Sequence, residues 1–176
     1  MNGKVHALIG VGTVACITLA NPRGFNLWGT NILPVISLAT AAAGSFMPDV
    51  DNPRTHAGHQ HKVTSKVVSK VGGGHRGITH SLIFPAFILA LMYYISTFAA
   101  SYKYIASLLM SLLFGYVTGW VMHIFADLFN GKGCPILMPL SKSKIHIVDL
   151  PSTGVVPWIF AVALIALMAL LTIGGF

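Results

Sequence analysis

The sequence predicts an all-α membrane protein built from about five transmembrane helices. Of its 176 residues, 55% are hydrophobic and only 9% are charged, whereas about a quarter of the residues in a soluble domain are charged. Long apolar segments alternate with two polar loops, as expected for a chain that crosses a bilayer several times. We therefore expect a single integral-membrane unit, residues 1–176, without a separate soluble domain.

Each expected span is an apolar segment that ends at a turn signal. The first begins near His6 and ends at the turn 21–24, and the second contains Pro34 and stops at Pro48, because proline and glycine interrupt helices. The expected helices are Val5–Ala20, Asn26 or Leu27 to Met47, Ile78–Ala100, Tyr104–Phe129 and Val155–Ile173.

The segment 51–77 is the longest polar loop. Lys62, Lys66 and Lys70 repeat every four residues with valines on the neighbouring face, which predicts a short basic amphipathic helix on the membrane surface. The same loop contains three further histidines, at positions 56, 59 and 61. Because their neighbours fix no geometry, we expect them to be solvated rather than to bind a metal.

The basic residues predict the orientation of the chain. With five spans, nine of the eleven Lys and Arg residues share the side of the N-terminus, and only Arg23 and Lys103 lie on the other. The nine are Lys4, Arg54, Lys62, Lys66, Lys70, Arg76, Lys132, Lys142 and Lys144. The positive-inside rule then predicts a multi-pass protein of the bacterial inner membrane with its N-terminus in the cytoplasm. The net charge of +7 indicates contact with anionic membrane lipids rather than with nucleic acid.

The segment Ser111–Asp127 carries the most informative pattern in the chain. Ser111, Gly115, Gly119, His123 and Asp127 recur at steps of four, so they share one stripe of a helix. The small residues allow close approach of another helix, and the imidazole and carboxylate then lie together at the helix end. A His and an Asp one turn apart can reach one cation or can pair with each other.

The other histidines and carboxylates map to the same side of the membrane. His6 begins the first expected span, Asp49 and Asp51 end the second, and His75 and His80 flank the start of the third. Ionisable side chains at helix ends within a membrane indicate function. Imidazole and carboxylate donors suit zinc, with manganese or iron as alternatives. This number of donors could bind one ion, or two ions bridged by a carboxylate. Sites with two metal ions are suited to the hydrolysis of phosphoesters. Cys16 and Cys134 indicate neither a disulfide nor a thiolate site.

Three short motifs resemble those of the YdjM-like inner-membrane proteins, a family described as metal-dependent hydrolases. They are Met47–Pro53 (MPDVDNP), His75–Ser81 (HRGITHS) and His123–Asp127 (HIFAD), and with His6 the resemblance extends to about Pro139. The order of these residues is also similar to that in the zinc-dependent phospholipase C and single-strand nuclease superfamily. That similarity implies metal ligation by His6, Asp49 or Asp51, His80, His123 and Asp127. The soluble enzymes carry a further His-and-acid motif, for which this chain offers only His146 and Asp149, so a complete trinuclear zinc site is not implied.

The remaining roles follow from the chemistry of the residues beside the expected ligands. The Arg76 guanidinium is suited to clamp a phosphate with two hydrogen bonds, and His75 is either a ligand or the acid that protonates the leaving group. Thr79 and Ser81 are expected to orient ligand imidazoles. We therefore expect a membrane-bound hydrolase that uses metal-activated water on a small or lipid phosphoester at the inner leaflet. The alternatives are a metal transporter or sensor, and a structural protein whose helix ends are held together by a metal.

Overall fold

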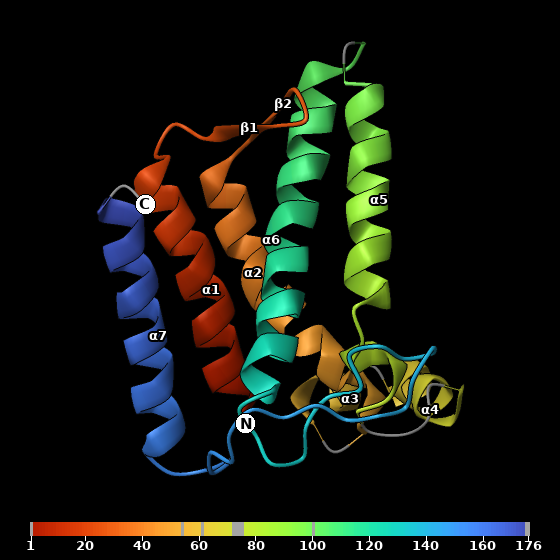
Figure 1. The fold of residues 1–176 in the computed structure, drawn as a ribbon. Coiled ribbons are helices and arrows are strands. Elements are labelled where there is room, and N and C mark those ends of the chain that lie inside the picture. The colour runs from red at the N-terminus through yellow and green to blue at the C-terminus, as the bar shows by residue number, and fades with distance from the viewer. Residues whose placement is uncertain (1, 54, 61, 72–75, 100, 175–176) are drawn as a thin grey trace.

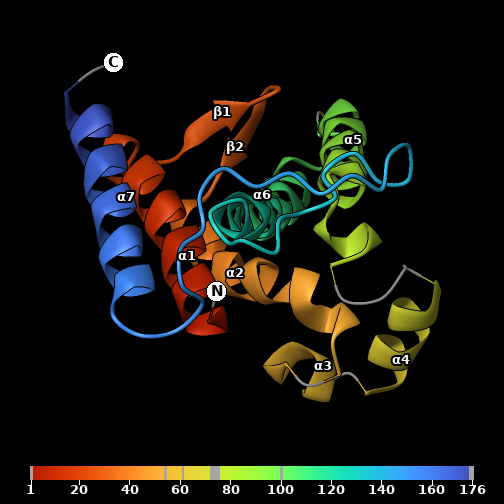
Figure 2. The same cartoon turned by 60° about the horizontal axis from the view of Figure 1, so that its bottom comes forward.

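Five helices lie side by side and form a bundle with α6 at its centre (Figures 1 and 2). The structure, a computed structural model, describes residues 2–53, 55–60, 62–71, 76–99 and 101–174. The five are α1 (Gly3–Ala20), α2 (Pro34–Phe46), α5 (Ile83–Thr97), α6 (Lys103–Asp127) and α7 (Val156–Ile173). Helix α6 packs against α1, α2 and α5, whereas α7 packs against α1 at the edge of the bundle. The predicted all-α membrane class is confirmed.

Three of these helices are long and apolar enough to cross a membrane by themselves. They are α1, α6 and α7, with 18, 25 and 18 residues. Helices α2 and α5 have only 13 and 15 residues, and each residue adds about 1.5 Å of length, so each falls short of a ~30 Å hydrocarbon core. Segments that are not α-helical flank both helices, and the helix boundaries predicted from the sequence were wrong at these segments.

The helix predicted to begin at Asn26 or Leu27 begins instead at Pro34. A two-stranded antiparallel hairpin precedes it, with β1 at Phe25–Leu27 and β2 at Thr30–Ile32. Trp28 and Gly29 form the two-residue turn, both with positive φ, 49° and 79°. Such a turn matches the twist of paired strands. Pro34 does not interrupt α2 but starts it, because proline is well tolerated in the first helical turn.

The third predicted span also begins later than expected. Residues Ile78–His80 form a short 3-10 helix, and α5 starts only at Ile83. A similar 3-10 helix, Met47–Asp51, continues α2 beyond Phe46. The polar loop between these two turns contains α3 (His56–Gln60) and α4 (Lys62–Val71). The short basic helix predicted in this loop is therefore present, and its three lysines are exposed.

The stripe of small residues on α6 lies against α2. Ser111, Gly115 and Gly119 are all buried. A Cβ atom at Gly115 would overlap the backbone carbonyl of Ser37, and one at Gly119 would overlap that of Ala41. The two backbones are therefore in direct contact, the arrangement that small residues permit between membrane helices.

This packing predicts that a side chain at Gly115 separates α2 from α6. We expect Gly115→Val to destabilise the protein by about 2 kcal/mol or more, because overpacking against a backbone forces the helices to move. Thermal unfolding in detergent measures the effect. Leu108→Val, on the exposed face of α6, is the matched control, and equal melting temperatures for the two variants would show that the contact is not rigid.

The two ends of the chain lie at opposite ends of the bundle. Helix α1 begins at the end of the bundle that holds α3 and α4, and α7 finishes at the end that holds the hairpin (Figure 1). Together with the distribution of Lys and Arg, this arrangement predicts a cytoplasmic N-terminus and a C-terminus outside the cytoplasm. A reporter fused after Phe176 should therefore be active only as an extracytoplasmic fusion. Cytoplasmic activity of that fusion would contradict the predicted orientation.

Candidate metal centre

Helices α1, α2 and α6 touch at one point, about one helical turn away from three of the candidate ligands. Gly10 of α1, Ser45 of α2 and Gly119 of α6 touch there, since a Cβ at Gly10 would overlap the Ser45 hydroxyl and lie 3.1 Å from the Gly119 Cα. Four residues from each contact, toward the α3–α4 end of the bundle, are His6, Asp49 and His123. Because four residues make about one helical turn, the close contact brings these three side chains together.

The hydrogen bond of His123 determines which of its nitrogens is available to a ligand. Nδ1 lies 2.6 Å from the Ser45 carbonyl oxygen. A carbonyl only accepts, so Nδ1 carries the proton and Nε2 has the lone pair. Nε2 is fully buried, with no hydrogen-bond partner in the described part of the chain. It lies 3.8 Å from Asp127 Oδ2 and 3.9 Å from Asp49 Oδ1. All three atoms are acceptors, so a cation between them could be bound by all three.

His80 is oriented in the same way by Asp51. Its Nδ1 lies 3.3 Å from Asp51 Oδ2 and 3.2 Å from Thr79 Oγ1, and the Thr79 hydroxyl itself donates to Asp51 Oδ2 at 2.6 Å. The other nitrogen, Nε2, lies 3.7 Å from Asp127 Oδ2 and 3.8 Å from Asp49 Oδ1. A carboxylate that holds the far nitrogen of an imidazole is the usual support of a metal-binding histidine.

The donor atoms have the spacing that a small tetrahedral ion requires. Ligands at about 2.0–2.1 Å from such an ion lie about 3.3 Å apart. The four pairs that join His80 or His123 Nε2 to an oxygen of Asp49 or Asp127 are separated by 3.7–3.9 Å. A contraction of a few tenths of an ångström would close these four atoms around one ion. Asp49 is therefore the carboxylate that faces this position, and Asp51 supports His80 from behind.

His6 faces the second oxygen of Asp127. Its Nε2 lies 3.4 Å from Asp127 Oδ1, and its ring stacks on that of His123 with centroids 3.8 Å apart. His6, His123 and Asp127 form one group that could hold a metal ion, and Asp49, His80 and His123 form another. Because His123 offers one free nitrogen, the two groups cannot both use it. Asp127, which lies beside both His6 and His123, would be the residue that both positions could use if two ions were bound.

Arg76 contacts the ligand cluster from the loop side. Its Nη2 lies 2.7 Å from Asp127 Oδ2, and its Nη1 donates to the Gly133 carbonyl at 3.1 Å. The backbone N–H of Arg76 donates to Asp51 Oδ2 at 3.0 Å. This residue has φ 60°, a conformation that favours glycine and is found for other residues mainly at functional sites. The strained backbone directs the amide to Asp51 and the guanidinium to Asp127.

A cavity of about 210 Å³ gives access to the cluster. Asp49, Arg76 and Asp127 form its inner wall. The outer wall includes Asn130, Lys132 and Ser152, from the segment that crosses the end of α6 (Figure 2). Burial, with a contribution from the Asp127 carboxylate, raises the pKa of the nearby Cys134 thiol to about 12. The cavity therefore borders the cluster at Asp49 and Asp127 and is lined by two cationic side chains, Arg76 and Lys132.

The structure brings together His6, Asp49, Asp51, Arg76, Thr79, His80, His123 and Asp127. The expected roles of these residues stay predictions: metal ligation for the histidines and aspartates, a phosphate clamp for Arg76 and support of an imidazole for Thr79. Ser81 differs from expectation, since its hydroxyl donates to the Ile78 carbonyl. His75 and His61 lie outside the described residues, whereas His59, His146 and Asp149 are exposed.

Sequence reasoning missed several residues that shape the site. The Ser45 carbonyl holds His123, the Trp120 indole N–H donates to the Thr79 carbonyl at 2.9 Å, and Lys132 lines the cavity mouth. Ser45 was detectable in principle, because it lies one turn before Asp49 in a run of small residues. No local signal placed Lys132, because the path of a long loop depends on the whole fold.

The fold and the site define a helical membrane protein with a buried cluster of histidines and carboxylates at one end. The profile of the YdjM inner membrane protein family matches residues 1–175, and the chain belongs to that family. It is 34% identical to the inner membrane protein YdjM of Escherichia coli (strain K12), over 79% of this chain and 66% of that protein. It is 30% identical to the uncharacterized protein YvsG of Bacillus subtilis (strain 168), over 79% of this chain and 74% of that protein. No solved structure matches the chain.

Proposed function

We propose that this protein is a membrane-bound metal-dependent hydrolase that acts on a phosphoester at the cytoplasmic leaflet. Zinc is the first choice of metal, with manganese or iron as alternatives. The observation that carries the proposal is the convergence of Asp49, His80, His123 and Asp127 beneath a cavity that also contacts Arg76. Mixed nitrogen and oxygen donors with an open side are typical of catalytic rather than structural zinc sites.

Each polar residue of the cluster has a definable task in such a hydrolase. Asp49, His80, His123 and Asp127 hold the ion, while Asp51 and the Ser45 carbonyl keep the two imidazoles in the tautomer with Nε2 free. A divalent ion in this position would lower the pKa of water to about 7 and would so supply a nucleophile at neutral pH. No Ser or Cys nucleophile is then needed.

Arg76 is proposed to hold the phosphate. Its Nε has no hydrogen-bond partner among the described residues, and its side chain lines the cavity. When an ion shares Asp127, the guanidinium no longer has to neutralise that carboxylate alone and can donate to a phosphate oxygen. Lys132 adds a second positive charge at the mouth. His75 remains the proposed additional ligand or leaving-group acid.

One observation favours a second candidate function, that of a structural protein in which the metal only holds helix ends together. His6, His80 and His123 are at most 1% exposed, and closed sites are typical of structural metals. Asp49, with 15% of its side chain exposed, and the cavity beside it argue for access by substrate. A transporter is less well supported, because every histidine and carboxylate of the described bundle lies toward the α3–α4 end and none lies mid-span.

The ligand assignment predicts different losses of metal for different carboxylates. Asp49→Asn should abolish stoichiometric zinc binding, because it removes a direct donor. Asp51→Asn should weaken it by about 10–100-fold, as expected for a residue that only supports an imidazole. Asp149→Asn, at an exposed carboxylate, is the matched control. Metal content and chelator competition measure the effects, and zinc affinity of Asp49→Asn equal to that of wild type would exclude Asp49 as a ligand.

The clamp assignment predicts a loss of turnover without loss of metal. Arg76→Lys keeps the positive charge beside Asp127 but removes the planar pair of donors. We expect its turnover to fall about 10²-fold, as for removal of one donor that stabilises transition-state charge. Lys142→Ala, a change at an exposed loop cation, should leave turnover unchanged.

The deciding experiment uses full-length protein purified in detergent and loaded with metal. Wild type and both variants are compared on a panel of soluble and lipid phosphoesters, with metal content measured in each sample. Hydrolysis by wild type that is lost in Arg76→Lys supports the proposal. If the metal-loaded wild type hydrolyses no ester of the panel, the result would favour the second candidate, in which the metal only holds helix ends together.

A further inference from the structure

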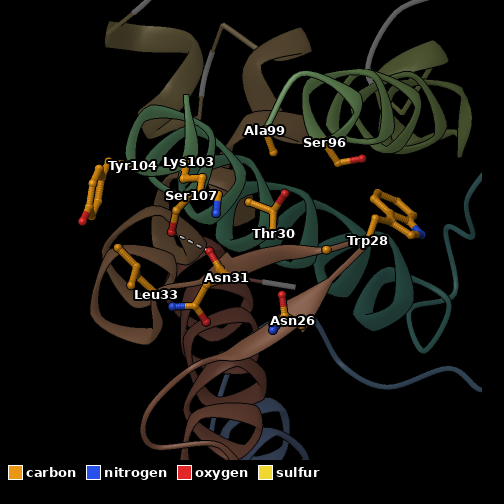
Figure 3. Close-up of a pocket in the computed structure, with 11 residues that line it drawn as sticks. Asn26, Trp28, Thr30, Asn31, Leu33, Ser96, Ala99, Lys103, Tyr104 and Ser107 are labelled. Carbon is orange, nitrogen blue, oxygen red and sulfur yellow. Dashed lines mark hydrogen bonds between the residues drawn. The ribbon is translucent and has the colours of Figure 1, made fainter. Parts of the chain in front are cut away.

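A second cavity lies at the opposite end of the bundle from the candidate metal centre. Its volume is about 580 Å³, within the range of small-ligand sites. The hairpin β1–β2, the end of α5 and the start of α6 enclose it (Figure 3). Its polar lining comes from Asn26, Thr30, Asn31, Ser96, Lys103 and Ser107.

The hairpin that forms this cavity is attached to α6 by two hydrogen bonds. The Ser107 hydroxyl donates to the Asn31 carbonyl at 2.6 Å (Figure 3), and the Leu33 N–H donates to the Ser111 hydroxyl at 2.7 Å. Phe25 also packs edge-on against Phe114 of α6, with ring centroids 5.2 Å apart. The cavity is therefore built by the fold and does not arise from a loosely attached loop.

One buried hydroxyl in the cavity wall has no internal partner. Thr30 is 4% exposed, yet its Oγ1 makes no hydrogen bond to any residue that the structure describes. Figure 3 shows its side chain in the space between the hairpin and the ends of α5 and α6. A buried polar atom normally has a partner, so this hydroxyl is a candidate hydrogen-bond donor to a polar ligand in the cavity.

The sign of the charge in the cavity is set by Lys103. It is the only charged residue among the described residues that line the cavity, and the four aspartates, which are the only acidic side chains in the sequence, are at positions 49, 51, 127 and 149. The C-terminal end of α5 and the N-terminal end of α6 both face the cavity, and their opposite dipole ends offset each other. One ammonium with hydroxyl and amide groups around it suits a ligand with a single negative charge.

We propose that this cavity binds the phosphodiester of a phospholipid headgroup, with Lys103 as the cation and the Thr30 hydroxyl as a donor. A phosphodiester has one negative charge and two acceptor oxygens, which match these groups. Exposed aromatic side chains surround the cavity, among them Trp28, Tyr93 and Tyr104. Trp and Tyr collect at headgroup level in membrane proteins. The acyl chains of the bound lipid would remain in the bilayer.

The proposal does not depend on any activity of the metal centre, since the two sites lie at opposite ends of the bundle (Figure 1). It would make the hairpin end a lipid-binding site in the leaflet opposite to the metal centre. A free phosphate ion offers similar oxygens without the acyl chains, and the test separates the two sources.

Native mass spectrometry of the full-length protein from detergent provides that test. Dihexanoyl phosphatidylglycerol is titrated against wild type, Lys103→Met, Thr30→Val and the control Arg23→Met. Arg23 is the other cation predicted for this end of the chain and does not line the cavity. We expect Lys103→Met to weaken binding about tenfold, the usual effect of losing one charged hydrogen bond, and Thr30→Val to weaken it severalfold. Arg23→Met should bind as wild type does.

Two further samples identify the source of the phosphate. Dihexanoylglycerol, which has the same chains and no phosphate, should not be retained, and 10 mM inorganic phosphate should not displace the phosphatidylglycerol. Equal losses for Lys103→Met and Arg23→Met would show general surface attraction and overturn the site. Complete displacement by inorganic phosphate would overturn the lipid assignment.

Discussion

The contact of α1, α2 and α6 at Gly10, Ser45 and Gly119 is the constraint on which the site depends. Only residues without a large side chain allow three helix backbones to meet at one point. His6 and His123 lie one helical turn from this contact on α1 and α6, and Asp49 lies the same number of residues from it on the 3-10 turn that continues α2, so the contact brings these three side chains together. A site built on rigid helices holds its donor atoms more precisely than one built on mobile segments. The same contact explains why the Ser45 carbonyl is close enough to hold His123.

Burial of so many ionisable groups at a helix end requires compensation within the cluster. Removing a carboxylate from water costs several kcal/mol unless it is paired and hydrogen-bonded. Asp127 has the Arg76 guanidinium, and Asp51 accepts from a backbone amide and the Thr79 hydroxyl. These bonds support the imidazoles but leave the Nε2 of His123 directed at oxygen atoms. The periphery of the cluster is therefore held by these hydrogen bonds, and the donor atoms at its centre are grouped closely enough that they could hold a metal ion.

The two ends of the bundle have different chemistry although the same helices connect them. At one end, imidazoles and carboxylates surround a small cavity with cations at its mouth. At the other, a hairpin borders a larger cavity, and the described residues that line it include a single lysine and no aspartate or glutamate. The apolar middle of the bundle separates these regions, and α6 extends from one to the other (Figure 1). Polar groups are concentrated where a helical membrane protein meets headgroups and water, because burial at mid-span is costly.

Composition and periodicity alone determined the helical membrane class, the basic helix at 62–71 and the stripe Ser111–Asp127, because these depend on residues close together in the sequence. The same local reasoning identified the histidines and carboxylates that the structure brings together. It failed for the hairpin at Trp28 and Gly29, where an apolar segment was read as helix although turn geometry and packing on α6 favour strands. Only the tertiary structure decided that Asp49 faces His80 and His123 while Asp51 lies behind. That difference arises from the 3-10 turn after Phe46 and the hydrogen bonds from Arg76 and Thr79, which join segments far apart in the chain.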